Sequence, residues 1–349
     1  MRNQTRELFK GYIKQQAQLN GVMEDTIRSG AKFVAAPSIA QTLEDRIQES
    51  SAFLSMINVY PVTEQEGENL GLGTGSTIAG TTDTSGGTER ATTDPTGFNQ
   101  FGYRCEQTNF DTHIRYAKLD MWAKFPDFQN RCRNAVTQQI ARDRLMIGWN
   151  GTSRAANSDR VANPLLQDVN EGWLQYIRDN DAARIMIEGV AASGKIKVDD
   201  TEATADYKNL DALVFDMVNS LLDEWHAEDT GLVVIVGRQL LSDKYFQIVD
   251  DSNAATEKVA SDILLSKKQL GGLPVYRVPF FPSRTIVVTT LKNLSIYWQE
   301  GTRRRAIKDK PELDQIEDYQ SVNEDYVVED TGAFCAAENV SYWDGSAWD

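Results

Sequence analysis

A long stretch rich in glycine, threonine and serine most constrains how this chain can fold. It lies between Val59 and Gln107 and includes the run GENLGLGTGSTIAGTTDTSGGTERATTDPTG. Structureless loops beyond about 15 residues are uncommon inside compact domains and are usually functional or disordered. Strand-like sequence flanks the stretch, MINVYPV before it and QTNFDTHIRYAKL after it. We therefore expect an extended two-stranded arm over 59–107 that reaches a neighbouring molecule.

The first 32 residues differ in charge from the rest of the chain. They carry six Lys or Arg against three Asp or Glu, whereas the whole chain has a formal net charge of −15. Their apolar residues recur every three to four positions, which predicts an amphipathic helix with a break near Asn20-Gly21. The segment GAKFVAAPS that follows, with its small residues and Pro37, indicates an accessible linker. Two alternatives stay open, a detachable arm and a helix docked on its own core.

The rest of the chain predicts both helices and strands. A long helix is expected over 127–147, opened by Pro126-Asp127 and closed by Gly148. A second amphipathic helix is expected over 210–225, and the apolar run GLVVIVG after it predicts a strand buried on both faces. This combination predicts α+β or α/β packing. The remaining candidates are a helix over 256–265 and strands over 274–278, 285–290, 294–298 and 325–328.

Composition excludes several classes of protein. No apolar run approaches the ~20 residues that cross a bilayer, and Met1–Lys10 is too polar for a secretory signal. Cys105, Cys132 and Cys335 lie far apart, which favours buried thiols in a reducing compartment. The acidic net charge disfavours a broad basic face for DNA. We expect a protein made in the cytoplasm, without disulfides and without a membrane partner.

A search for catalytic groups yields none. His113 and His226 have no second His or Cys at metal-ligand spacing, and no GxSxG motif is present. The glycines of GLGTGS match neither GxGxxG nor GxxxxGK[ST], and no helix pattern follows them. We expect no catalytic residue, cofactor or metal.

A basic cluster precedes an acidic one near the C-terminus. Two interpretations are open, a solvated face and complementary ridges through which one subunit meets the next. The basic residues are Arg303, Arg304, Arg305, Lys308 and Lys310, and the acidic residues are Glu312, Asp314, Glu317, Asp318, Glu324, Asp325, Glu329 and Asp330.

The chain closely resembles the major capsid proteins of P2-like tailed bacteriophages. The resembling stretches are PSIAQTLEDRIQESSAFL, TTDTSGGTER, YAKLDMWAKFPDFQ, SDRVANPLLQDVNEGWLQ, LVVIVGRQLLSDKYF, LPVYRVPFFP and NEDYVVED. They run through nearly the whole chain, and the departures gather in the N-terminal arm, around Gly189 to Asp206, and in the tail. The resemblance implies an α+β, HK97-like capsid fold and a structural role without enzyme activity.

The resemblance also implies a division of the chain and a set of partners. It implies an N-terminal arm over 1–50, an E-loop over 59–107, a P-domain over 108–206 plus 325–349 with the spine helix 127–147, and an A-domain over 208–324. Subunits of this family form hexamers and pentamers that close into an icosahedral shell around double-stranded DNA. The implied partners are a scaffolding protein or maturation protease, a portal protein, a decoration protein and DNA contacted non-specifically, in a virion assembled in the bacterial cytoplasm.

Two kinds of site follow from the resemblance together with arm location and charge. The family's proteolytic trimming would fall at Phe33-Val34 and remove 1–33. No lysine lies between Lys32 and Lys118, so the arm lacks the nucleophile for a Lys-Asn cross-link. The alternatives are a nanocompartment shell and an enzyme with a Gly-rich lid and an anion clamp at 303–305. Intersubunit contacts are expected at Gly71, Thr74, Thr82, Arg90, Arg303, Arg304, Arg305, Glu317 and Asp318.

Overall fold

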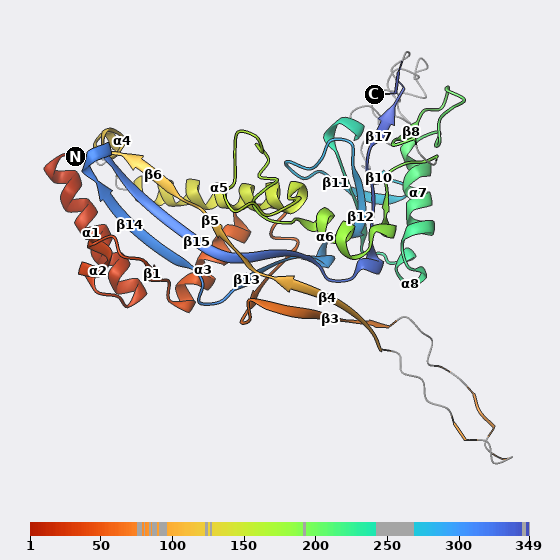
Figure 1. The fold of residues 1–349 in the computed structure, drawn as a ribbon, viewed down its shortest axis with the longest axis horizontal. Helices are drawn as coiled ribbons and strands as arrows, with labels where there is room; N and C mark the ends of the chain where they lie inside the picture. Colours follow the sequence, from red (N-terminus) through yellow and green to blue (C-terminus); the bar gives the residue numbers. More distant parts are fainter. Residues whose placement is uncertain are drawn as a thin grey trace.

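The computed structural model shows an elongated body from which a two-stranded hairpin projects (Figure 1). It describes residues 1–74, 79, 81–83, 85, 89–90, 96–122, 125, 128–190, 193–241, 269–343 and 347–348. Helices line the body along two main sheets, in agreement with the predicted α+β class. No helix in these ranges is both long and apolar enough to cross a membrane.

The larger sheet has seven strands and is organised around β15. Its order is β1-β14-β15-β13-β2, and β5 and β6 also pair with β15. Because β15 continues without a break from Gln315 to Val328, the expected domain boundary at Glu324 falls inside one strand. The strands are β1 (Phe33–Val34), β2 (Asn58–Val62), β5 (Glu106–Asn109), β6 (Thr112–Arg115), β13 (Leu294–Gln299), β14 (Arg304–Lys310) and β15 (Gln315–Val328).

The charged clusters near the C-terminus form strands, which corrects the expectation of a strand over 325–328 alone. Ile307, Ile316 and Val322 supply apolar contacts, and charged residues between them pair across β14 and β15. These pairs lie at diagonal positions of the two strands, and opposite charges there are close enough to stabilise the pairing. Because many residues of β14 and β15 are charged, the alternation of buried and exposed residues is hard to recognise in the sequence.

The second sheet has six strands in the order β10-β11-β9-β12-β16-β7. All five residues of β9 are buried, which confirms the prediction from GLVVIVG. The helix expected over 210–225 is divided into α7 (Leu210–Leu221) and α8 (Glu224–Ala227). The helix expected over 256–265 lies outside the described residues. The strands are β7 (Ile185–Met186), β9 (Leu232–Val236), β10 (Gln269–Leu270), β11 (Leu273–Tyr276), β12 (Ile286–Thr290) and β16 (Phe334–Ala337); β8 (Ile196–Val198) pairs separately with β17 (Val340–Tyr342).

The helices agree with the predicted pattern at two of its main features. The first helix ends before Gly21, whose φ of 65° gives the left-handed cap that favours glycine. The long helix α5 (Phe128–Asn150) is present, but it continues past Gly148, where a Cβ would lie 2.5 Å from the Trp173 ring. Gly148 thus serves close packing and does not end the helix. The other helices are α1 (Asn3–Asn20), α2 (Glu24–Arg28), α3 (Pro37–Glu49), α4 (Tyr116–Trp122) and α6 (Trp173–Asn180), with short 3-10 turns at Ala182–Arg184, Leu291–Asn293, Pro311–Leu313 and Thr331–Ala333.

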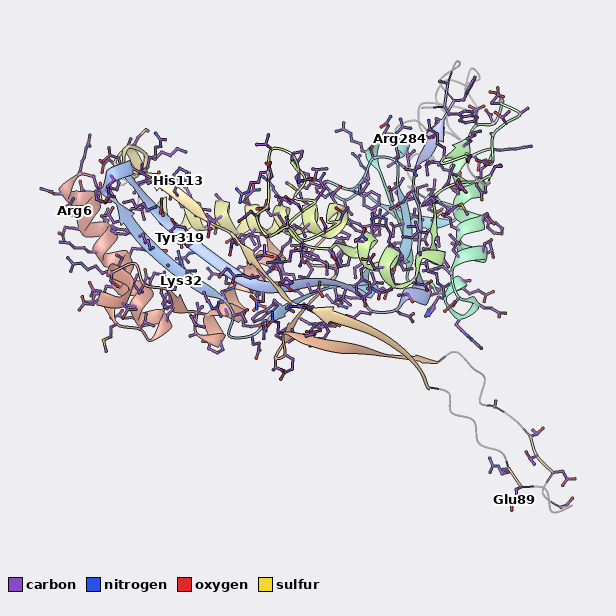
Figure 2. All side chains as sticks on the ribbon, in the orientation of Figure 1. Arg6, Lys32, Glu89, His113, Arg284 and Tyr319 are labelled. Carbon is purple, nitrogen blue, oxygen red and sulfur yellow. The ribbon has the colours of Figure 1, made fainter. Side chains whose placement is uncertain are left out.

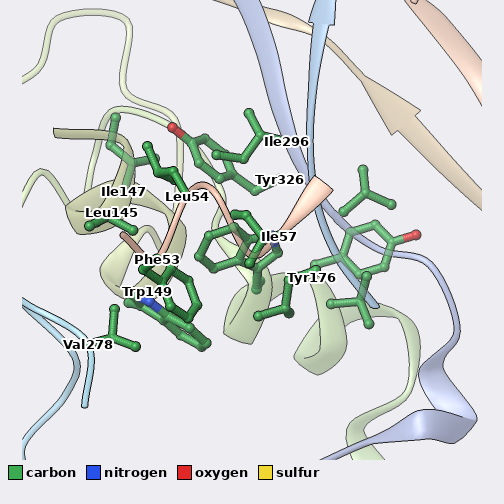
Figure 3. Packing of buried hydrophobic residues seen from close by; sticks show 14 of the residues in the cluster. Phe53, Leu54, Ile57, Leu145, Ile147, Trp149, Tyr176, Val278, Ile296 and Tyr326 are labelled. Atoms are coloured by element: carbon green, nitrogen blue, oxygen red, sulfur yellow. The ribbon is translucent and has the colours of Figure 1, made fainter. Parts of the chain in front are cut away.

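Three apolar clusters hold the described chain together. The largest surrounds Trp149 and Trp173, whose ring centroids are 4.9 Å apart, and joins α5 and α6 to the sheets (Figure 3). The second packs α7 against the six-stranded sheet. The third is small and joins the N-terminal helices to Ile307 of β14. The N-terminal helices therefore dock on the body through an apolar contact of their own.

Candidate interaction and cleavage sites

The projecting arm is an antiparallel hairpin of β3 (Glu66–Thr74) and β4 (Thr96–Arg104). Its register places Gly71 opposite Asn99 and Thr74 opposite Thr96. Thr82 and Arg90 are exposed, and Figure 2 shows Glu89 near the far tip of the arm, distant from the labelled residues of the body. The two-stranded arm predicted over 59–107 is thus present in its described part, but 59–62 and 106–107 pair within the seven-stranded sheet. Intersubunit contact at Gly71, Thr74, Thr82 and Arg90 stays a prediction.

Hydrogen bonds and one carboxylate fix the root of the arm. The Cys105 backbone N–H donates to the Gln65 carbonyl at 2.8 Å, and the Arg104 backbone N–H donates to Asp325 Oδ2 at 2.8 Å. Burial raises the pKa of Asp325 to about 6, and the nearby carboxylates of Glu171 and Glu106 add to the increase. A group that gains a proton in mild acid therefore holds the point where the arm leaves the body.

The N-terminal module, defined as residues 1–32, makes polar contacts with the body through Asp120 and Arg305. Asp120 of α4 accepts hydrogen bonds from the Arg2 backbone N–H at 2.9 Å and the Thr5 hydroxyl at 2.6 Å. Arg305 donates to the Tyr12 hydroxyl at 2.8 Å and to Gln16 Oε1 at 3.1 Å. This docked position matches the interpretation of the basic segment as a helix that packs on its own core.

The candidate cleavage site lies in strand β1, at the edge of the seven-stranded sheet. Phe33 faces Arg305 and Val34 faces Arg304 in an antiparallel pair, and the Ala35 N–H donates to the Arg303 carbonyl at 2.9 Å. Val34 is 47% exposed, but Phe33 is only 6% exposed. The expectation of an accessible linker is therefore wrong for Phe33, because its ring packs into the small apolar cluster of the N-terminal module.

A buried network of charges ties α3 to α5 and β15. Arg144 of α5 contacts Glu44 of α3 at 2.6 Å and Glu324 of β15 at 2.9 Å, and Arg303 also pairs with Glu44. Burial acts to raise the pKa of Glu44, but Arg144 and Arg303 outweigh burial and lower it to about 2. Sequence reasoning missed this network. The sequence signal that could have revealed it is a single charged residue, such as Arg144, among the apolar positions of a helical pattern.

The arginines at 303–305 do not converge on one site. Arg303 is buried with Glu44, Arg304 is exposed, and Arg305 pairs with Asp318 at 2.6 Å. This arrangement argues against an anion clamp. Lys310 likewise pairs with Glu317 at 2.8 Å. The basic and acidic clusters thus contact each other within one chain, and their predicted role between subunits stays a prediction.

The remaining chemistry-bearing residues are dispersed. His113 is exposed on β6, and His226 Nε2 lies 3.1 Å from Asp330 Oδ2. Burial raises the pKa of the Cys105 and Cys335 thiols to about 12, so neither forms a thiolate near neutral pH. Across the described ranges, no group of three His, Cys, Asp or Glu residues is arranged to hold a metal ion.

An elongated α+β body, a projecting hairpin arm and a long helix along the larger sheet define the class of HK97-like shell subunits. Among solved structures, the chain matches one titled as a satellite phage P4 procapsid including the size determination (Sid) protein. The TM-score is 0.80 and the identity 45%, covering 99% of this chain and 100% of that one. The fold expected from the resemblance is confirmed.

The chain belongs to the P2 family of phage major capsid proteins, whose family model matches residues 8–340. It is 47% identical to the capsid protein of Escherichia phage P2 over 351 residues, which cover 99% of this chain and 97% of that protein. It is 40% identical to the major capsid protein of Serratia phage KSP20 over 348 residues, again 99% and 97%. The protein is thus a structural component of an icosahedral phage capsid and part of the virion.

Proposed function

We propose that copies of this chain associate as hexamers and pentamers that enclose double-stranded DNA, and that the β3–β4 arm makes a principal contact between neighbours. The projection of the arm away from the body carries this proposal (Figure 1). An isolated two-stranded hairpin is marginally stable in water. A neighbouring subunit would supply the packing that a two-stranded hairpin needs.

Shortening the arm tests this contact. Thr74 and Thr96 face each other in the hairpin register, so replacing residues 75–95 by Asn-Gly closes β3 and β4 with a two-residue turn. The variant should fold and remain in small species, and electron microscopy should find few or no shells. The control is Val161→Ser, a change at a 93% exposed residue outside the arm, which should assemble as the unchanged protein does. Normal shells from the shortened chain would contradict the proposal.

The contacts between subunits are proposed to be non-covalent. The arm has no lysine, because none lies between Lys32 and Lys118. Shells should therefore dissociate fully to single chains in hot detergent. A ladder of covalent oligomers on a denaturing gel would show the opposite.

Removal of residues 1–33 during maturation is the second part of the proposal. The basic charge of the N-terminal module and its attachment through a small, separate cluster support a piece that can leave without unfolding the body. The scissile bond is Phe33-Val34. Intact-mass measurement of DNA-filled particles should find chains that begin at Val34, and full-length chains would refute removal.

The remaining assignments concern partners and the division of the chain. The P-domain would be built around the seven-stranded sheet and α5, the A-domain around the six-stranded sheet, and the chain would have no enzyme activity. The proposed partners are a scaffolding protein or maturation protease, a portal protein, a decoration protein and the genome, met in the cytoplasm of the bacterial host. The net charge of −15 disfavours tight binding to DNA, so any contact with the genome would be weak and non-specific. Affinity purification from infected cells, followed by mass spectrometry, tests these partners.

A further inference from the structure

We infer that cleavage after Phe33 is gated by the N-terminal module, so that the Phe33-Val34 bond becomes available only after the module leaves β14. The inference rests on the proposed removal of residues 1–33 and concerns its regulation. Hydrolysis adds one water across this amide and leaves a carboxyl group on Phe33 and an amino group on Val34. A protease must first hold the chain on both sides of that bond.

The backbone around the bond is already engaged. Proteins that bind a peptide by strand addition use the hydrogen-bonding groups of its extended backbone. In β1, alternate residues turn these groups towards β14, and Phe33 lies opposite Arg305 and Val34 opposite Arg304. The Ala35 N–H is bonded to the Arg303 carbonyl at 2.9 Å. A protease therefore competes with β14 for the same strand.

The side chain before the bond is engaged as well. Phe33 is 6% exposed and packs with Ile13, Ala17 and Ile27 of the module and with Ile307 of β14. Moving Phe33 into a protease pocket would break this cluster. Because the same residues dock the module, release of Phe33 and undocking of α1 and α2 are coupled.

A polar contact closes the module over β14 beside the same strand. Arg305, which faces Phe33 in the strand pair, donates from its side chain to Tyr12 and Gln16 of α1. The Gly30 backbone also lies close to Lys308, since a Cβ there would meet the Lys308 side chain at 2.7 Å. Contacts from α1, the loop after α2 and β1 thus all converge on β14.

Gating has a consequence for the order of events. When cleavage acts on a transiently open state and closing is fast, its rate follows the population of that state. Subunits whose module stays docked would be cut slowly, even with protease present. A process that undocks the module would therefore set the time of cleavage.

Chymotrypsin is a suitable probe, because its apolar pocket accepts Phe before the scissile bond. The purified full-length chain is digested, and the product cut after Phe33 is followed by intact mass. A synthetic peptide spanning 28–38 gives the rate for an open site. We expect the chain to be cut at least about 100-fold more slowly than the peptide.

A matched pair of variants tests whether the cluster holds the gate. Ile27 is fully buried and Met23 is 79% exposed on the same segment. Ile27→Ala should speed the cut roughly 30-fold or more, since it removes packing from the closed state, whereas Met23→Ala should leave the rate unchanged. Thermal unfolding by circular dichroism establishes that the body of each variant remains folded.

A reversible lock tests the strand pairing without weakening the fold. Val34 and Arg304 are exposed and directly opposite, and facing residues of antiparallel strands lie within disulfide reach. In the double variant Val34→Cys, Arg304→Cys, the oxidised form should resist the cut and the reduced form should be cut at its own basal rate. The reduced form of the same molecule controls for both substitutions.

Two results would overturn the gate. One is a full-length chain cut as fast as the peptide, and the other is an oxidised double variant cut as fast as its reduced form. The mass of chains in DNA-filled particles tests removal itself, and that result is independent of the chymotrypsin rates. Failure of the gate and failure of the proposed maturation are thus told apart.

Discussion

Two consecutive parts of the N-terminal region are attached to the body in different ways. The N-terminal module (1–32) is held by a small apolar cluster and by Arg305, whose side chain is 23% exposed. Helix α3 (37–49) is held by Glu44, which sits with Arg144, Arg303 and Glu324 in a fully buried network. The attachment thus changes within a few residues of Phe33, from a small separate cluster to the main core, where Ala40 and Ile47 of α3 pack and the charge of Glu44 is buried.

This difference indicates which of the two segments can separate from the body at the lower cost in free energy. Removing one partner of a buried ion pair strands the other charge and costs about 3–5 kcal/mol. Departure of α3 would leave Arg303 in that position and would leave Arg144 with Glu324 alone. Departure of the module leaves no such charge, because Arg305 keeps Asp318 as its partner and Asp120 is able to meet water. The two segments therefore differ in the charge that their departure would expose, which is consistent with the proposed removal of the module and retention of α3.

Glu44→Gln should produce the largest effect. It removes the charge that balances Arg144 and Arg303, and we expect a loss of about 3–5 kcal/mol in the free energy of unfolding. Urea unfolding of the full-length chain measures it. Glu49→Gln, at an exposed position of the same helix, is the control and should change stability by less than about 0.5 kcal/mol. Equal effects from the two variants would remove the basis of the comparison.

Ile13→Ala should loosen the module and leave α3 in place. Ile13 is 5% exposed in the small cluster, and deletion of a buried isoleucine side chain costs about 2–5 kcal/mol. Amide hydrogen exchange should become faster in α1, α2 and β1 and stay unchanged in α3. Faster exchange in α3 to the same degree would mean that the two parts open together.

Acid should weaken the attachment of α3. The pKa of Glu44 is about 2 in the folded chain and 4.5 without its surroundings, so its contribution is present above 4.5 and is lost as pH falls towards 2. Burial raises the pKa of Glu324, which acts in the opposite sense, and we expect a net loss of less than about 2 kcal/mol between about pH 5.5 and about pH 3. Urea midpoints at about pH 5.5 and about pH 3 measure it. A drop of the same size in Glu44→Gln would assign the loss to other groups.

Tyr12→Phe should have the smallest effect. It removes one hydroxyl acceptor from Arg305, whose guanidinium keeps Gln16 and Asp318. Loss of one hydrogen bond of this kind costs about 0.5–1.5 kcal/mol. Hydrogen exchange in α1 measures the change, with Tyr60→Phe at an exposed site as the control. A loss as large as that of Ile13→Ala would make the polar contact, and not the cluster, the main attachment.

Local pattern was sufficient to predict part of this structure. The break at Asn20-Gly21, the buried strand at GLVVIVG and the long helix α5 each depend on neighbours in the sequence. The two-stranded arm was predictable for the same reason, since Gly and Thr are concentrated between two strand-like flanks. These features need no knowledge of distant contacts.

The features that were missed depend on distant contacts. Glu44 and Arg303 are 259 residues apart in sequence, so nothing near either residue predicts their pairing. The burial of Phe33 depends on Ile307, and a segment of small residues around it suggested an open linker. Strands β14 and β15 were not predicted in full. Their charged residues pair with each other across the two strands, and the local sequence does not show this pairing.

Strand β15 gives the subunit a mechanical property. It pairs with β14 beside the N-terminal module, with β5 just after the arm, and with β13 towards the far end of the body, and its Asp325 holds the arm root. A pull on β4 passes through Cys105 into β5, whose ladder hydrogen bonds to β15 run across the strand direction. Tension along the strands therefore acts on all of these hydrogen bonds at the same time, as a shear force, and does not break them one after another. Force on the arm would thus pass through its root to the sheet that also carries the candidate cleavage site.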